Sequence, residues 1–149
     1  MKIFSMKEYI RMMKSFDREN ISVFLGAGAS VQSQIPSAKV LVWQFKRTLY
    51  CNENNMSEQY FKDIQSLEGR RKIQGFFDGL SDYPADGDSR EYSFYFEKCY
   101  QTILSRRNFI SKIVSNKLPS NGYLCLASLI KNGYIKDAFT TNFDSLIES

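Results

Sequence analysis

The feature that most restricts the fold of this sequence is a run of five small residues, Gly26 to Ser30, directly after an apolar segment. Residues 20–25, NISVFL, are short, apolar and rich in β-branched and aromatic side chains, which is typical of a buried strand. A surface turn needs one or two glycines, whereas five small residues in succession indicate that something approaches the backbone closely. Ser37 then stands in front of an apolar pattern with helical spacing, so it is a candidate cap, as Ser5 is for a helix predicted over residues 5–17. We therefore predict a strand, a tight turn and a helix in succession.

The last thirty residues contain a second strand followed by a turn. Residues 121–131 have helical apolar spacing and stop at Asn132–Gly133, a common helix terminator. Residues 134–139, YIKDAF, predict a strand, and the polar turn 140–144, TTNFD, leads toward another helix from Ser145. Strands separated by helical segments are typical of α/β folds, in which ligands bind beyond the carboxyl ends of parallel strands. We therefore expect both turns to lie at one edge of a parallel sheet.

The chemistry of the two turns favours a dinucleotide site. Around Gly26–Ser30, glycines let backbone N–H groups approach a pyrophosphate, and the next helix would direct its positive end toward the anion. The fingerprint G-x-G-x-x-G is incomplete because Val31 occupies the third glycine position, so a tight turn without a ligand is the alternative. Asn142 offers an amide, and Asp144 offers a carboxylate for ribose hydroxyls or a carboxamide. Either side chain could instead cap a helix at Ser145.

Composition narrows the function classes. The chain has 149 residues, enough for about one domain, and its formal charge of +4 comes from scattered Lys and Arg without a basic stripe, so we expect no direct nucleic-acid partner. Three distant cysteines without a C-x-x-C pair indicate neither a zinc ribbon nor a disulfide framework, and they fit the cytoplasm. No signal peptide and no run of about 18 apolar residues occurs, so we expect no membrane span. The sequence has no histidine, so an imidazole base must come from elsewhere.

Two stretches together resemble the NAD-binding domain of sirtuins. These are FLGAGAS with the following QIPSA, and LASLIKNGYIKDAFTTNFD near the end of the chain. Sirtuin deacylases have Asp-Phe-Arg after Ile-Pro, where this chain has residues 37–39, Ser-Ala-Lys, and they have Gln where this chain has Thr141. Deacylases also carry a four-cysteine zinc module. The sequence is therefore more similar to the sirtuin-like domains of bacterial anti-phage defence proteins, which cleave NAD.

The resemblance implies a fold and a function. The fold would be α/β, a Rossmann-like parallel sheet across residues 1–149, with a helical insertion at about 52–118 and an incomplete C-terminal part. The function would be that of an NAD+ glycohydrolase (NADase) depleting NAD in antiviral defence, with NAD as substrate and no metal. A homo-oligomer, or a fused or partner defence subunit, would accompany it. The alternatives are a non-catalytic module for NAD or ADP-ribose and an NAD-dependent protein deacylase.

The resemblance also implies the site residues. Asn142 would be catalytic, holding the nicotinamide ribose and positioning a water, and Asp144 would bind or orient the carboxamide. The sirtuin histidine normally follows the second turn, and this sequence ends soon after it, so we expect the N-terminal part of a longer protein, weak or inactive by itself. The expected NAD-binding residues are Gly26, Ala27, Gly28, Ala29, Ser30, Pro36, Thr141, Asn142 and Asp144.

Overall fold

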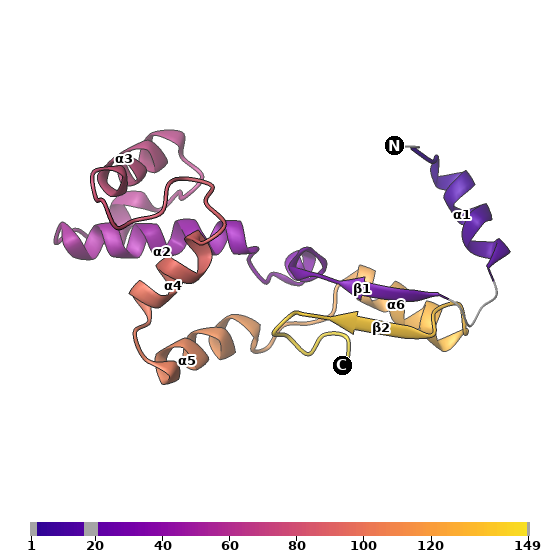
Figure 1. Cartoon of the computed structure of the whole chain (residues 1–149). Coiled ribbons are helices and arrows are strands. Elements are labelled where there is room, and N and C mark those ends of the chain that lie inside the picture. The colour runs from indigo at the N-terminus through magenta and orange to yellow at the C-terminus, as the bar shows by residue number, and fades with distance from the viewer. Residues whose placement is uncertain (1–2, 17–20, 149) are drawn as a thin grey trace. The chain divides into compact units, whose positions relative to one another are not determined.

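A computed structural model describes residues 3–16 and 21–148, and its backbone contacts divide the chain into two compact units. The sheet unit consists of residues 1–35 and 116–149, and the helical unit of residues 36–115 (Figure 1). The sheet unit contains both strands, whereas the helical unit contains helices only among the described residues.

The sheet unit contains the two predicted strands. Strands β1 (Ser22–Leu25) and β2 (Asp137–Thr140) pair in parallel, in a register that places Leu25 opposite Thr140. Helix α1 (Met6–Ser15) precedes β1, the 3-10 helix η2 (Ala27–Ser33) follows it, and α6 (Asn121–Lys131) precedes β2. The parallel pairing expected from the sequence is confirmed.

Local capping signals explain where several helices of the sheet unit begin and end. The Ser5 hydroxyl accepts a hydrogen bond from the Glu8 backbone N–H, and the Ser5 backbone N–H donates to the Glu8 carboxylate, so α1 begins with a capping box. Helix α6 ends at Lys131, and Gly133 follows with a φ of 73°, the left-handed conformation that glycine adopts without strain. The sequence predicted these boundaries because both signals are local.

The helical unit is built around α2 (Ala38–Glu53), whose N-terminus is capped by Ser37. The 3-10 helix η3 (Glu58–Phe61), α3 (Leu67–Asp78) and α4 (Glu91–Cys99) pack against α2, and α5 (Ile103–Val114) follows. Phe45 of α2 lies at the centre of an aromatic cluster with Tyr92, Phe96, Tyr100 and Phe109, with ring centroids 5.4 to 6.1 Å from its own. The unit therefore has its own core. The buried core residues are Leu41, Val42, Trp43, Phe45, Tyr50, Cys51, Ile73, Phe77 and Tyr95.

The expected Rossmann-like sheet with a helical insertion is wrong. The described residues form only two strands, and most of them are helical. The physical reason is that the aromatic residues between the strands pack helix against helix, which leaves no segment to extend the sheet. One face of the sheet is also uncovered, since Phe24 and Phe139 are 70% and 56% exposed, whereas a doubly wound sheet carries helices on both faces. The helix expected from Ser145 is likewise replaced by a turn at residues 146–148.

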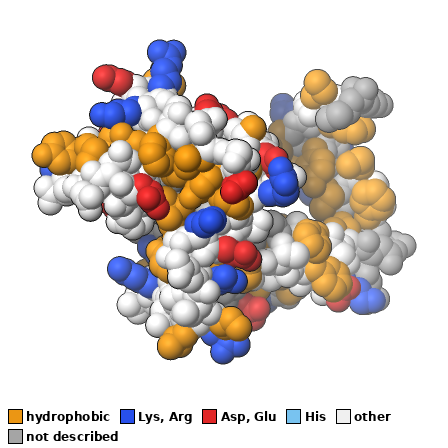
Figure 2. Space-filling model, turned by 60° about the vertical axis from the view of Figure 1, so that its left-hand side comes forward, with side chains coloured by type: hydrophobic (Ala, Val, Ile, Leu, Met, Phe, Trp, Pro, Cys, Tyr) orange, Lys and Arg blue, Asp and Glu red, His pale blue; other side chains and the backbone are white. Residues whose placement is uncertain are grey.

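The surface gives two further observations. On the face shown in Figure 2, acidic and basic side chains are interspersed, without a field of one sign. Within residues 3–16 and 21–148, no helix has the length and apolar character that crossing a bilayer requires.

Candidate functional site

The two predicted turns meet at one edge of the sheet. Because Leu25 and Thr140 are paired, the chain leaves β1 and β2 side by side. The Thr141 backbone N–H donates to the Leu25 carbonyl at 3.4 Å, and the Asn142 amide nitrogen donates to the Gly26 carbonyl at 3.2 Å. The strand pairing thus brings Gly26–Ser30 and residues 141–144 together.

Ser30 is the centre of this junction. Its side chain is 1% exposed, and its hydroxyl donates to Asp144 Oδ2 at 2.8 Å. It accepts a hydrogen bond from Asn142 Nδ2 at 3.0 Å and lies 2.9 Å from the Tyr123 hydroxyl. A serine hydroxyl has one proton and two lone pairs, so Tyr123 must be the donor in the last bond. All three positions on Ser30 are therefore occupied within the chain.

Asn142 and Asp144 are fixed by the same network. Both amide hydrogens of Asn142 are used, one by Gly26 and one by Ser30, and its backbone N–H donates to Thr140 Oγ1 at 3.0 Å. No hydrogen bond of the described residues uses Asn142 Oδ1, which leaves this acceptor for a ligand. Asp144 Oδ1 accepts from the Leu146 backbone at 3.2 Å, so the local capping contact considered above is present without a following helix.

Gly26 and Gly28 are exposed, and no contact within the described part of the chain requires a glycine at either position. Gly26 has an extended backbone with φ −106° and ψ −178°, and neither residue has a positive φ. A Cβ atom built on either glycine would meet nothing within 4 Å. The open space above the turn is therefore available to a molecule that approaches the backbone.

The other predicted site residues are less involved. The Ala29 backbone N–H closes the turn onto the Gly26 carbonyl at 3.0 Å, while Ala27 lies exposed at the start of η2. Pro36 is half-buried and begins the helical unit, whereas the junction lies in the sheet unit. Residues 27–33 form the seven-residue 3-10 helix η2, and the α-helix α2 begins at Ala38, directly after its predicted cap Ser37.

Tyr123 is the residue of the junction that the sequence did not indicate. It is buried at the start of α6, and its hydroxyl contacts Ser30, 93 positions earlier in the chain. The sequence offers only a general rule that could have indicated this contact, which is that a buried tyrosine hydroxyl normally has a hydrogen-bond partner.

No protein-family model matches this chain, and none of the curated proteins searched matches it. The described residues also contain no group of three or more His, Cys, Asp or Glu side chains arranged to hold a metal ion.

Proposed function

We propose that the junction of the two turns binds NAD, and that the chain belongs to an enzyme that cleaves the bond between nicotinamide and ribose. The observation that carries the proposal is the pair Gly26 and Gly28, which are exposed, lie beside a fixed polar network, and have no steric or conformational cause among residues 3–16 and 21–148. A diphosphate that approaches the main chain supplies such a cause, because a side chain there would block it.

The hydrogen bonds suggest separate roles for the polar residues. Asn142 Oδ1 is the open acceptor for a ribose hydroxyl, and its amide group is held in place by Gly26 and Ser30. Ser30 acts as a positioning residue, since its hydroxyl is saturated by Asp144, Asn142 and Tyr123. Asp144 keeps a second lone pair on each oxygen, which is sufficient to accept a hydrogen bond from a carboxamide.

Cleavage of the bond between nicotinamide and ribose requires little acid catalysis. The bond between C1′ of the ribose and the nicotinamide nitrogen breaks, its electron pair goes to the ring, and nicotinamide leaves as a neutral molecule. Water adds to the oxocarbenium-like carbon and loses a proton, as in glycoside hydrolysis. A general base accelerates such a step about 100- to 10,000-fold, and this sequence has no histidine to serve as one. We therefore expect the chain by itself to bind NAD and to release nicotinamide slowly.

The wider biological role rests on the sirtuin resemblance. The proposal includes NAD depletion in anti-phage defence, in the cytoplasm, by an assembly of several copies or with a partner subunit. A non-catalytic NAD or ADP-ribose module is the second candidate, and the saturated Ser30 favours it, because this hydroxyl is committed to structure.

The test is calorimetric titration of the chain with NAD, compared with the variant Gly28→Val. A Cβ atom at this position meets no described atom within 4 Å, so we expect the variant to fold, while the valine side chain occupies the space above the turn and weakens NAD binding at least about tenfold. Gly75→Val is the matched control, because Gly75 is also exposed, has no neighbour for a Cβ and lies in the helical unit. Equal NAD affinity in Gly28→Val and the unmodified chain would overturn the site, and rapid nicotinamide release would show that a base is present in these 149 residues.

A further inference from the structure

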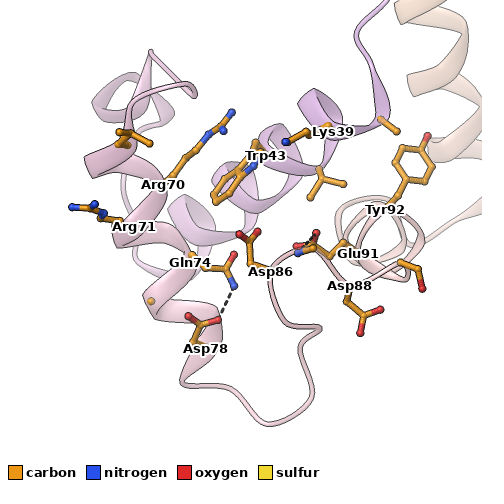
Figure 3. A pocket seen from close by; sticks show the side chains of 16 residues that line it. Lys39, Trp43, Arg70, Arg71, Gln74, Asp78, Asp86, Asp88, Glu91 and Tyr92 are labelled. Carbon is orange, nitrogen blue, oxygen red and sulfur yellow. Dashed lines mark hydrogen bonds between the residues drawn. The ribbon is translucent and has the colours of Figure 1, made fainter. Parts of the chain in front are cut away.

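The helical unit contains a pocket of about 740 Å³ that the nucleotide proposal does not use. It lies between the first turns of α2, the length of α3, the loop before α4 and the start of α4 (Figure 3). Its volume falls in the range of about 300 to 1,000 Å³ found for small-molecule sites. All its lining residues belong to residues 38–92, so the pocket is complete within one unit.

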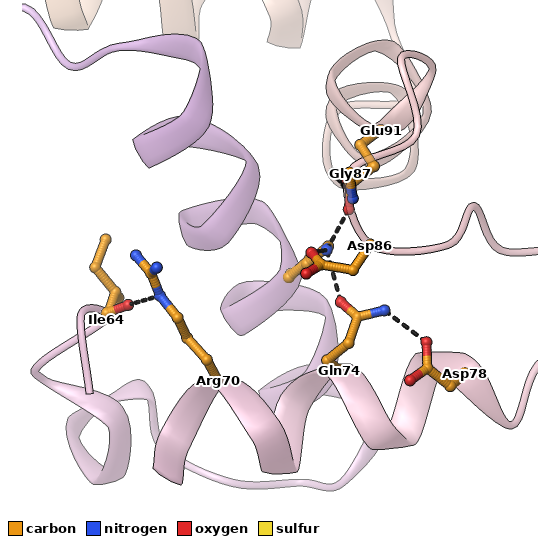
Figure 4. Close-up of polar contacts among 8 residues, drawn as sticks. Ile64, Arg70, Gln74, Asp78, Asp86, Gly87 and Glu91 are labelled. Carbon is orange, nitrogen blue, oxygen red and sulfur yellow. Dashed lines mark hydrogen bonds and ion pairs between the residues drawn. The ribbon is translucent and has the colours of Figure 1, made fainter. Parts of the chain in front are cut away.

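One side of the pocket has a fixed positive charge next to an aromatic ring. The Arg70 guanidinium lies 4.7 Å from the centre of the Trp43 ring. It donates to the Ile64 carbonyl at 2.7 Å and to Gln65 Oε1 at 2.6 Å, and Figure 4 shows the first of these bonds. These contacts hold Arg70 against Trp43, so this wall is rigid before any ligand arrives.

Two further cations on this side have no carboxylate partner. Lys39 of α2 and Arg71 of α3 both line the pocket and are exposed, and neither forms an ion pair with any residue that the structure describes. Figure 3 shows Lys39 and Arg70 near Trp43, and Arg71 farther along, extending outward from α3. Their charges are available to an anionic group.

The opposite side carries carboxylates with spare acceptor capacity. Asp78 accepts one hydrogen bond, from Gln74 Nε2 at 2.7 Å. Asp86 has a side chain that is 62% exposed, and only its Oδ1 atom contacts Lys46, at 3.3 Å. Asp88 contributes less, because both its oxygens are bound by Arg90. Asp78 and Asp86 are therefore the groups available to a cation.

Gly75 provides room between the two charged sides. It lies in the interior of α3, where glycine is less favourable than alanine, and it has neither a positive φ nor a neighbour within 4 Å of a built Cβ. Its place in the pocket lining means that the absent side chain widens the pocket. This observation is independent of the charges, and it also indicates an external molecule.

We propose that this pocket binds a small zwitterion whose positive and negative groups are separated by a short aliphatic chain. The anionic group lies against Lys39 and Arg71, the cationic group against Asp78 and Asp86, and the aliphatic part between these two sides, beside Trp43. A dianion would face the two carboxylates, and a dication would face the free cations, so a molecule with one charge of each sign fits best.

The probe is 6-aminohexanoate, compared with hexanoate and hexylamine, each of which lacks one of its charges. Trp43 is the only tryptophan in the sequence and lines the pocket, so its fluorescence reports binding directly. We expect a saturable change with 6-aminohexanoate and an affinity at least about fivefold lower for each analogue. No saturable change with 6-aminohexanoate would overturn the proposal. Equal affinity for all three compounds would also overturn it, because the pocket would then recognise only the aliphatic chain.

Single substitutions show which side of the pocket binds each end of 6-aminohexanoate. Arg71→Gln and Asp78→Asn should each weaken 6-aminohexanoate about threefold, because each removes one exposed charge from the pocket. Arg71→Gln should leave hexylamine unaffected, and Asp78→Asn should leave hexanoate unaffected. The control is Arg107→Gln, an exposed arginine of α5 outside the lining, which should change nothing. If Arg107→Gln weakens the probe as much as Arg71→Gln, the effect is that of net charge and the assignment is wrong.

Discussion

The buried Lys46 allows a quantitative test of the helical unit. Its side chain is 0% exposed, and Nζ forms an ion pair with Glu91 and donates to Gln74 Oε1 at 2.7 Å. Figure 4 shows the side chains of Gln74, Asp86 and Glu91 close to one another. The variant Lys46→Met keeps most of the apolar stem of the side chain and removes the ammonium group, so most of the packing around the stem is retained.

The expected loss of stability follows from the group that Lys46→Met leaves unpaired. Glu91 has a side chain that is only 11% exposed, so loss of Lys46 leaves a carboxylate that is buried and no longer paired. Removing one partner of a buried pair typically costs about 3 to 5 kcal/mol. Loss of the cation contact with the Trp43 ring, 4.5 Å from Nζ, adds about 1 kcal/mol. Because small domains have about 5 to 15 kcal/mol of stability in total, Lys46→Met should lower the urea midpoint strongly.

The assay is urea unfolding followed by circular dichroism, since Trp43 fluorescence would respond to the substitution itself. The double variant Lys46→Met with Glu91→Gln should recover about half of the loss, because the neutral amide needs no counter-ion and still accepts from the Gly87 backbone. Asp86→Asn is the control and should cost less than about 1 kcal/mol, because Asp86 is largely exposed. A loss below about 1 kcal/mol in Lys46→Met, or no recovery in the double variant, would show that Glu91 does not depend on Lys46.

Two further predictions concern buried polar groups. The Tyr95 hydroxyl is fully buried and has no hydrogen-bond partner among the described residues, so Tyr95→Phe should leave the free energy of unfolding unchanged or raise it by up to about 1 kcal/mol, as measured by urea titration. Burial, with a smaller effect of the Glu58 carboxylate, raises the pKa of the Cys99 thiol to about 12, so this residue stays protonated in mildly alkaline buffer. Cys125 is exposed, so iodoacetamide at pH 8 should modify Cys125 well before Cys99, and mass spectrometry of the peptides would reveal the opposite order if it occurred.

The sequence allowed prediction of those elements that depend on short-range signals. Ser5 and Ser37 act as helix caps, Gly133 ends α6, and the two strands pair in parallel as expected. In each case the signal and the structure lie within a few residues of one another, apart from the strand pairing, which follows from the order of the elements. The meeting of the two turns could therefore be predicted as well.

The sheet architecture could not be predicted, because helical spacing does not say what a helix packs against. The apolar stripe of α2 was compatible with covering a sheet, yet Phe45 stacks on Phe96 and meets Phe109 edge to face, so the helices cover one another. The role of Ser30 was hidden for a similar reason. Its partners Tyr123 and Asn142 lie 93 and 112 positions away, and no local pattern specifies such contacts.

The glycines connect the two proposed sites in one experiment. Gly87 and Gly133 are explained by φ angles of 84° and 73°, whereas Gly28 and Gly75 have neither a positive φ nor a crowded Cβ position. If these two glycines are required by ligands, Gly28→Val should weaken the binding of NAD and leave the binding of 6-aminohexanoate unaffected. Gly75→Val should do the reverse. Two sites in separate units demand this reciprocal pattern. If one variant binds neither ligand, the substitution has disrupted the fold and does not report on a site. If both variants bind both ligands normally, neither glycine is required by a ligand.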